Sequence, residues 1–82
     1  MITKEEFESL EPGQGILDNN FARWEVEGVR REESQVIVIA TCPGWPTDHL
    51  RWLDRGDEGC GIADENGILI LSLNHENASI AA

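Results

Sequence analysis

Four residues of this chain carry side chains that commonly bind metals or act as nucleophiles: Cys42, His49, Cys60 and His75. Two thiolates and two imidazoles form an acceptable zinc ligand set. The spacing does not favour one, because neither cysteine belongs to a Cys-x2-4-Cys pair and the histidines are too far apart for a His-x3-5-His pair. We therefore expect no metal and no other cofactor, two small buried cysteines and two surface histidines.

The two cysteines could instead form a redox pair or supply a catalytic nucleophile. A disulfide between Cys42 and Cys60 would close the base of the segment between them, but we expect free thiols in a reducing compartment. Pairing either cysteine with a histidine is weak support for catalysis without a surrounding motif. The chain has no nucleophile elbow, phosphate-binding loop, dinucleotide fingerprint or His-Glu-x-x-His motif. These absences favour a protein that is not an enzyme.

The tryptophans are the more informative residues. Trp45 lies in a loop between Pro43 and Pro46, and a side chain held in this way is preorganised for binding at little entropic cost. The alternative is that Trp45 folds back over the end of the sheet as a lid for the core. The binding site that we expect from the first interpretation contains Trp45, His49, Arg51, Trp52 and Arg55.

The residues that follow this loop are predicted to form a short amphipathic helix. Thr47 is a suitable N-cap, and the apolar side chains recur at helical spacing. At ~100° per residue, one side of this helix carries His49, Leu50, Trp52 and Leu53. The other side carries Asp48, Arg51, Asp54 and Arg55. Leu50 and Leu53 are expected to pack on a sheet, with His49 and Trp52 half buried at the edge.

The rest of the chain is predicted to form a helix and short strands. Thr3 and Glu6 make a capping box for a helix of about Lys4 to Leu10. Alternating or continuous apolar patterns predict strands over 14–18, 21–31, 35–41, 59–63 and 68–73. The alternation slips at Gly28, which predicts a bulge or bend. Asn66-Gly67 is a strong hairpin signal between the last two strands.

These elements predict one domain, residues 1–82, that is mainly β with short helices (α+β). It is divided into an N-terminal helix and cap (1–12), a three-strand meander (13–41), a loop and helical insertion (42–58), a C-terminal hairpin (59–74) and a tail that frays (75–82). We expect a small, strongly bent antiparallel sheet of about five strands. Its organisation resembles an SH3-like barrel, in which a short helical turn precedes the last strand or hairpin. The resemblance implies architecture only and carries no functional residue.

Charge and hydropathy limit the partners. The chain has 16 acidic and 6 basic residues, a net charge of -10. Such a surface repels phosphate backbones, so we expect no generic nucleic-acid binding, and a protein partner with a basic surface suits it better. The N-terminus lacks the pattern of a signal peptide, and no apolar run approaches the ~18 residues that span a bilayer. We therefore expect a cytoplasmic protein that does not bind membranes.

The sequence thus predicts a small acidic protein-interaction module of the adaptor or inhibitor type. Its size and lack of familiar motifs suggest a bacterial, phage or other mobile-element origin. One alternative is a small-molecule or peptide-binding domain with a tryptophan-lined site between the helical insertion and the sheet. A second is a small Cys/His enzyme. Strands at 36–40 and 68–73 are apolar on both faces and the strand at 14–18 offers an open edge, so we also expect a two-fold homodimer unless the helices cover the second face.

Overall fold

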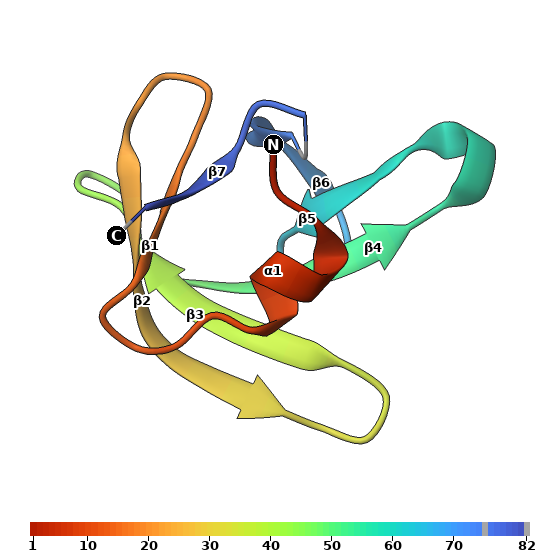
Figure 1. The fold of residues 1–82 in the computed structure, drawn as a ribbon, viewed down its shortest axis with the longest axis horizontal. Coiled ribbons are helices and arrows are strands. Elements are labelled where there is room, and N and C mark those ends of the chain that lie inside the picture. The colour runs from red at the N-terminus through yellow and green to blue at the C-terminus, as the bar shows by residue number, and fades with distance from the viewer. Residues whose placement is uncertain (75, 82) are drawn as a thin grey trace.

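The computed structural model describes residues 1–74 and 76–81, except for the side chain of Glu58. The described residues form one short α-helix and seven strands, which make a curled antiparallel half-barrel (Figure 1). The helical elements are α1 (Lys4–Glu8) and the 3-10 turn η1 (Gly56–Glu58), and the strands are β1 (Gly15–Leu17), β2 (Arg23–Arg31), β3 (Val36–Thr41), β4 (Asp48–Asp54), β5 (Cys60–Ala63), β6 (Leu69–Asn74) and β7 (Ser79–Ala81). No helix within these residues is long and apolar enough to cross a membrane.

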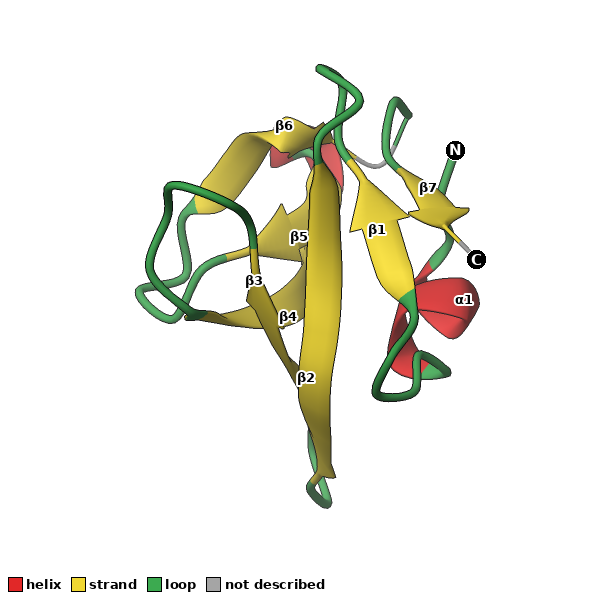
Figure 2. Cartoon of the chain, turned by 90° about the vertical axis from the view of Figure 1, so that its left-hand side faces the viewer, coloured by secondary structure: helices red, strands yellow, loops and turns green. Residues whose placement is uncertain are grey.

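The strands lie in the order β6-β5-β4-β3-β2-β1-β7. From β1 to β6 each strand pairs antiparallel with its neighbour in the chain, and β7 returns to pair with β1. The amide of Asn19 donates to the carbonyl of Ser72 at 2.9 Å, which ties the β1–β2 turn to β6. The sheet therefore curls until β6 touches the far side at one end, and Figure 2 shows this curvature beside the long strand β2.

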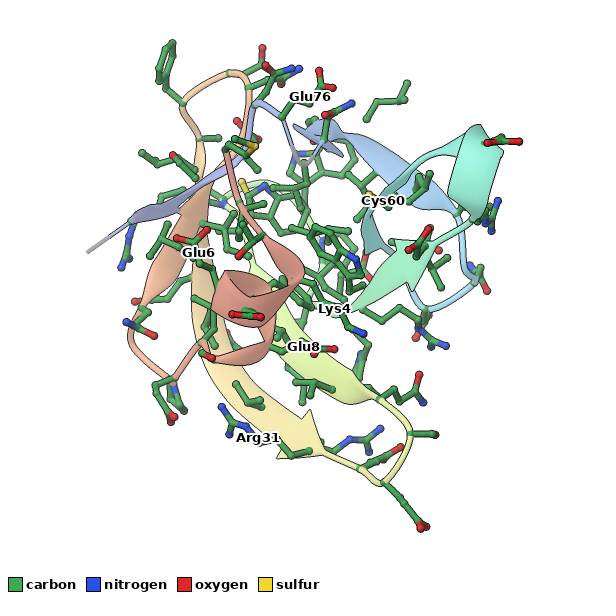
Figure 3. The ribbon with its side chains drawn as sticks, turned by 45° about the vertical axis from the view of Figure 1, so that its right-hand side comes forward. Lys4, Glu6, Glu8, Arg31, Cys60 and Glu76 are labelled. Carbon is green, nitrogen blue, oxygen red and sulfur yellow. The ribbon has the colours of Figure 1, made fainter. Side chains whose placement is uncertain are left out.

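Helix α1 packs on the inner face of the sheet, where it contacts β3 and β4 (Figure 1). The predicted capping box is present, with the Glu6 amide donating to Thr3 Oγ1 at 3.1 Å and the Thr3 amide to Glu6 Oε1 at 3.0 Å. The buried ring of Phe7 lies 6.2 Å from the Trp52 ring, centroid to centroid. Arg31 at the end of β2 donates to the carbonyl of Leu10 at 3.1 Å, which holds the end of the helical segment against the sheet (Figure 3).

The predicted helical insertion is wrong, because residues 48–54 form strand β4. β4 pairs with β3 on one side and β5 on the other, so its backbone groups are satisfied by two neighbours. A helix of about two turns would have little stability of its own in water, whereas the strand completes a continuous ladder. The period of two places Leu50 and Trp52 on the inner face and His49, Arg51 and Leu53 on the outer face.

The expected fraying of the tail is also wrong for the described residues. Ser79–Ala81 form β7, which pairs with all three residues of β1. Ala78 just before it is fully buried and belongs to the core. β1 is therefore an interior strand rather than the open edge expected at 14–18, and the sheet has seven strands instead of about five.

Two local predictions are confirmed. The pairing of β2 with β3 shifts between Val26 and Gly28, which is the predicted bulge. Residues 64–67 form the turn of the β5–β6 hairpin, with Gly67 in the left-handed region at a φ of 78° and the Asp64 amide donating to the Ile68 carbonyl at 3.0 Å. Both signals depend only on neighbouring residues, and the bulge and the turn lie where the sequence predicts them.

Candidate functional site

The β3–β4 loop presents the most exposed tryptophan of the described residues. The Trp45 amide donates to the Cys42 carbonyl at 2.9 Å, and Gly44 between them has a φ of 87°, which glycine adopts readily. This tight turn leaves the Trp45 side chain 68% exposed. An indole with that exposure does not have the burial expected of a lid over the core.

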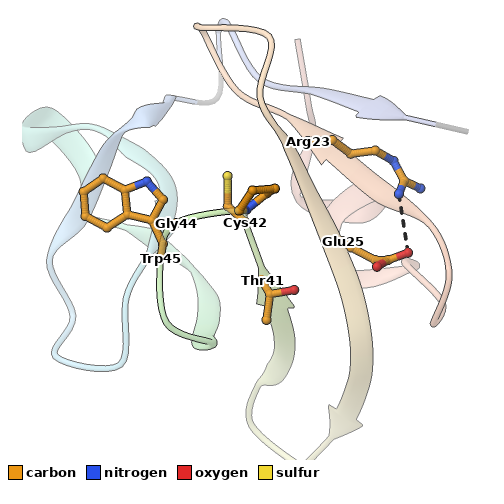
Figure 4. Close-up of a pocket in the computed structure, with 7 residues that line it drawn as sticks. Arg23, Glu25, Thr41, Cys42, Gly44 and Trp45 are labelled. Atoms are coloured by element: carbon orange, nitrogen blue, oxygen red, sulfur yellow. Dashed lines mark ion pairs between the residues drawn. The ribbon is translucent and has the colours of Figure 1, made fainter.

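A hollow of about 490 Å³ lies on one side of this loop (Figure 4). Its lining residues are Arg23, Glu25, Thr41, Cys42, Pro43, Gly44 and Trp45. The two charged side chains in this set form an ion pair, with Arg23 Nη1 3.5 Å from Glu25 Oε1. Arg23 also donates to the Gly13 carbonyl at 3.1 Å. The charges of this hollow therefore compensate each other.

A second hollow of about 280 Å³ is also lined by Trp45. It is lined by Asp18, Asn20, Trp24, Trp45, Asp48, Ile70 and Ser72. These residues come from the β1–β2 turn, β2, the β3–β4 connection, the start of β4, and β6. Trp45 therefore belongs to the lining of both hollows at this end of the half-barrel.

Asp18 and Trp24 form the buried part of the smaller hollow. Asp18 is 7% exposed, and its Oδ1 accepts from the amides of Asn20 at 2.8 Å and Ala22 at 2.9 Å. Its Oδ2 accepts from Trp24 Nε1 at 3.2 Å. A buried carboxylate needs such donors because burial removes its water. The three bonds fix the turn and the indole relative to each other, so this part of the hollow is preorganised.

Cys42 lies beside this buried carboxylate. Burial raises the pKa of the Cys42 thiol, and the negative charge of Asp18 raises it further. A thiol with a raised pKa is a weak nucleophile at neutral pH. Both cysteines are free, and Cys60 pairs with Asp54 at the opposite end of β4. β4 is seven residues long, about 20 Å, whereas a disulfide needs its two Cα atoms within about 7 Å.

The residues grouped into a site from the sequence do not lie together. Trp45 is at the loop, whereas Trp52 packs inward against Phe7. The other three have side chains on the outer face and reach the 64–67 turn: His49 Nδ1 lies 4.0 Å from Glu65 Oε2, Arg51 donates to the Glu65 carbonyl at 3.2 Å, and Arg55 donates to the Gly67 carbonyl. These contacts hold the β5–β6 hairpin against β4.

The metal set considered from the sequence is not assembled by the described part of the chain. Within residues 1–74 and 76–81, no three His, Cys, Asp or Glu side chains are grouped so that they could hold a metal ion. His75, one of the four residues considered, lies outside the described residues.

Three residues of this end of the molecule were not singled out by sequence reasoning. Asp18 and Asp48 line the smaller hollow, and Phe21 stands at the adjacent β1–β2 turn with 86% of its side chain exposed. Phe21 has a φ of 62°, the one left-handed non-glycine backbone among the described residues. The break between the predicted strands 14–18 and 21–31 indicated a turn here, but not its contact with β6.

Comparison with known proteins gives no match: no family model fits this chain, and neither the curated proteins nor the solved structures contain a significantly similar one.

Proposed function

We propose that this chain is a non-enzymatic protein-interaction module that binds its partner at the end of the half-barrel carrying Trp45 and Phe21. The observation that supports this most is the exposure of Trp45 between two hollows. A large aromatic side chain next to concave surface is typical of the residues that dominate binding energy in interfaces. The tight loop also limits the entropy that Trp45 loses when it is bound.

Phe21 adds a second exposed aromatic side chain at the same end. A non-glycine residue in the left-handed region costs on the order of 1 kcal/mol, and the exposed ring gains nothing from the core. Folding alone would favour glycine or asparagine at this position. The side chain is therefore explained better by contact with a partner than by the stability of the isolated chain.

The acidic surface indicates the kind of partner. A net charge of -10 favours a protein partner with a basic surface and disfavours nucleic acid. Such a partner suits the proposed role of an adaptor or inhibitor that acts in the cytoplasm. The alternative of a small-molecule or peptide site keeps one supporting observation, because the larger hollow falls within the ~300–1,000 Å³ of ordinary ligand sites. The Cys/His enzyme has less support, because Cys42 is buried with a raised pKa.

A capture experiment with three proteins tests this proposal. The wild-type chain, a Trp45→Ala variant and an Ile68→Ala control are each used to capture partners, and their unfolding free energies are measured beside them. Ile68 is 62% exposed and lines neither hollow, so it matches Trp45 as an exposed apolar residue outside the site. We expect a specific partner that the Trp45 variant loses and the Ile68 variant retains, with all three proteins equally stable. A partner retained by all three would contradict the proposal.

The two-fold homodimer expected from the sequence stays a prediction. Its main argument was an uncovered outer face, and two residues on that face, Ile37 and Ala63, are buried. The 64–67 turn, held by Arg51 and Arg55, lies against the same face of β4 and reduces the need for a second copy. Light scattering at micromolar and higher concentration tests the dimer, and a mass of 9.1 kDa throughout would refute it.

A further inference from the structure

The smaller hollow combines aromatic side chains with acidic groups that form no ion pair among the described residues. Trp24 and Trp45 present indole rings to it, Ile70 an aliphatic side chain, and Asp18 and Asp48 carboxylates. Its lining within the described part of the chain includes no lysine or arginine. Among the described residues, no ion pair involves either carboxylate. The larger hollow differs in this respect, because its arginine and glutamate pair with each other.

Asp48 is the acidic group that is free to bind. Its Oδ1 accepts from the His49 amide at 2.8 Å, while no described residue donates a hydrogen bond to its Oδ2. The side chain is half-buried, so an ion pair formed there is screened less than one on the open surface. Asp18 is held by three N–H donors beneath it and adds its charge to the same space.

We propose that this hollow binds the cationic end of a lysine or arginine side chain of the partner, an inference that rests on the proposed function and specifies its chemistry. Indole rings attract cations, Ile70 offers an apolar surface for the alkyl stem, and Asp48 pairs with the charge. The 280 Å³ volume equals about nine water volumes, which accommodates such a side chain. An anion would meet two carboxylates and no compensating cation among the described residues. A purely apolar group would remove the water from both carboxylates.

The wall of the hollow is rigid enough to be selective. The β1–β2 turn is closed by the Asp18 amide donating to the Ala22 carbonyl at 3.0 Å and by the Asn19 bond to β6. The Trp24 indole is fixed by Asp18. The Trp45 side chain, by contrast, forms no hydrogen bond with the described residues. It is therefore the side chain that can close over a bound cation.

Nuclear magnetic resonance titration of the full chain labelled with nitrogen-15 tests this inference. The probes are a capped Gly-Gly-Lys-Gly-Gly peptide, the same peptide with arginine, an uncharged norleucine peptide, and n-butylammonium as a free amine. The three tryptophan indole N–H signals are the reporters. We expect the lysine and arginine peptides to shift the signals of Trp24 and Trp45 while Trp52, which packs against Phe7 on the inner face, stays unchanged. The norleucine peptide should shift none of them.

Two matched variants identify the carboxylate. Asp48→Asn should weaken the lysine peptide by about fivefold, the effect of one partly shielded ion pair. Asp54→Asn at the other end of β4 is the control, because Asp54 likewise accepts one backbone bond, from the Gly56 amide at 2.9 Å, but lines neither hollow. Equal effects of the two variants would mean that only net charge matters, and would overturn the inference.

The remaining outcomes separate this inference from the proposed function. Shifts by the norleucine peptide equal to those by the lysine peptide, or no shift at Trp24 and Trp45, would refute the cationic site while leaving capture through Trp45 intact. A lysine peptide that binds more weakly than n-butylammonium would mean that the peptide backbone does not fit and that a free amine is the ligand, which overturns the assignment to a partner side chain. If the peptides bind as expected but Trp45→Ala captures every partner, the cationic site stands and the proposed docking surface falls.

Discussion

Replacing Asp18 by asparagine is expected to destabilise the fold by about 2–3 kcal/mol, through loss of a charge-assisted hydrogen bond. The asparagine oxygen can still accept from the amides of Asn20 and Ala22, which now bond to Asp18 Oδ1. Its NH₂ group then faces Trp24 Nε1, which at present donates to Asp18 Oδ2 at 3.2 Å. Two donors meet in a buried space, and the indole N–H loses its acceptor.

The partner of this bond can be removed to test the reasoning. In a Trp24→Phe background no indole N–H is present, so Asp18→Asn loses only the charge assistance of the two backbone bonds and should cost about 1 kcal/mol. The double-mutant cycle should therefore give a coupling of about 1–2 kcal/mol between Asp18 and Trp24. Asp48→Asn in the same background is the control, because Asp48 lines the same hollow without a bond to Trp24.

Urea unfolding followed by far-ultraviolet circular dichroism is the appropriate assay, since the substitution of Trp24 changes the fluorescence. The slope of free energy against urea must stay constant across the four proteins for the cycle to be valid. A coupling below about 0.5 kcal/mol would refute the reasoning, because it would mean that the two side chains act independently.

Three further predictions concern β4, Cys42 and nucleic acid. Leu50→Asp should unfold the protein, whereas Leu53→Asp on the outer face of β4 should cost less than half as much in urea unfolding; equal costs would favour the helix. Burial raises the pKa of the Cys42 thiol, and the charge of Asp18 adds to the shift. The stability that the protonated Cys42 thiol contributes is therefore full below the pKa of the unfolded thiol, and it is lost as the pH rises through the pKa of the folded thiol. The unfolding free energy should fall in that alkaline range for the wild type and less for Cys42→Ala, and equal slopes would contradict this. Generic duplex DNA should not bind at physiological salt in a gel-shift titration, and micromolar affinity that weakens steeply with salt would reveal an unrecognised basic face.

The predictions from sequence that succeeded depend on neighbouring residues. The capping box of α1 joins Thr3 to Glu6, three positions away, and both hydrogen bonds are present. The phase slip at Gly28 and the Asn66-Gly67 turn likewise require only local backbone geometry. Signals of this kind are read correctly because the rest of the fold does not have to be known.

The prediction for β4 failed because the deciding interactions are non-local. A period of two places Leu50 and Trp52 on one face, and ~100° per residue places Leu50 and Leu53 on one side, so both periods give segment 48–54 an apolar face. Without β4, the strands β3 and β5 would each have backbone N–H and C=O groups with no strand to pair with on one side. Residues 48–54 themselves carry no sign of this requirement. β7 failed for the same reason, since a small polar segment becomes a strand only because β1 offers it an edge.

The error in β4 also explains why the residues grouped into a site from the sequence do not lie together. A helical wheel brings His49 and Trp52 to one side, whereas a strand places them on opposite faces of the sheet. Trp45 is exposed as its loop position between two prolines indicated, since that position does not depend on what comes next in the chain, and its role in binding stays a prediction. Asp18 could not be ranked from sequence, because its importance comes from the Trp24 indole reaching back to it across the hairpin.

The basic residues of the chain offset only a part of its acidic charge. Every arginine is engaged by an acceptor of this chain, either a carboxylate or a main-chain carbonyl: Arg23, Arg30, Arg31, Arg51 and Arg55. These pairs stabilise particular contacts, and three of them hold α1 or the β5–β6 hairpin in place. They leave most of the 16 acidic side chains without a cation of the chain to balance them. A basic partner should therefore be attracted from a distance, and the rate of association should fall as salt screens this field, whereas the contact at Trp45 should govern how slowly the complex dissociates.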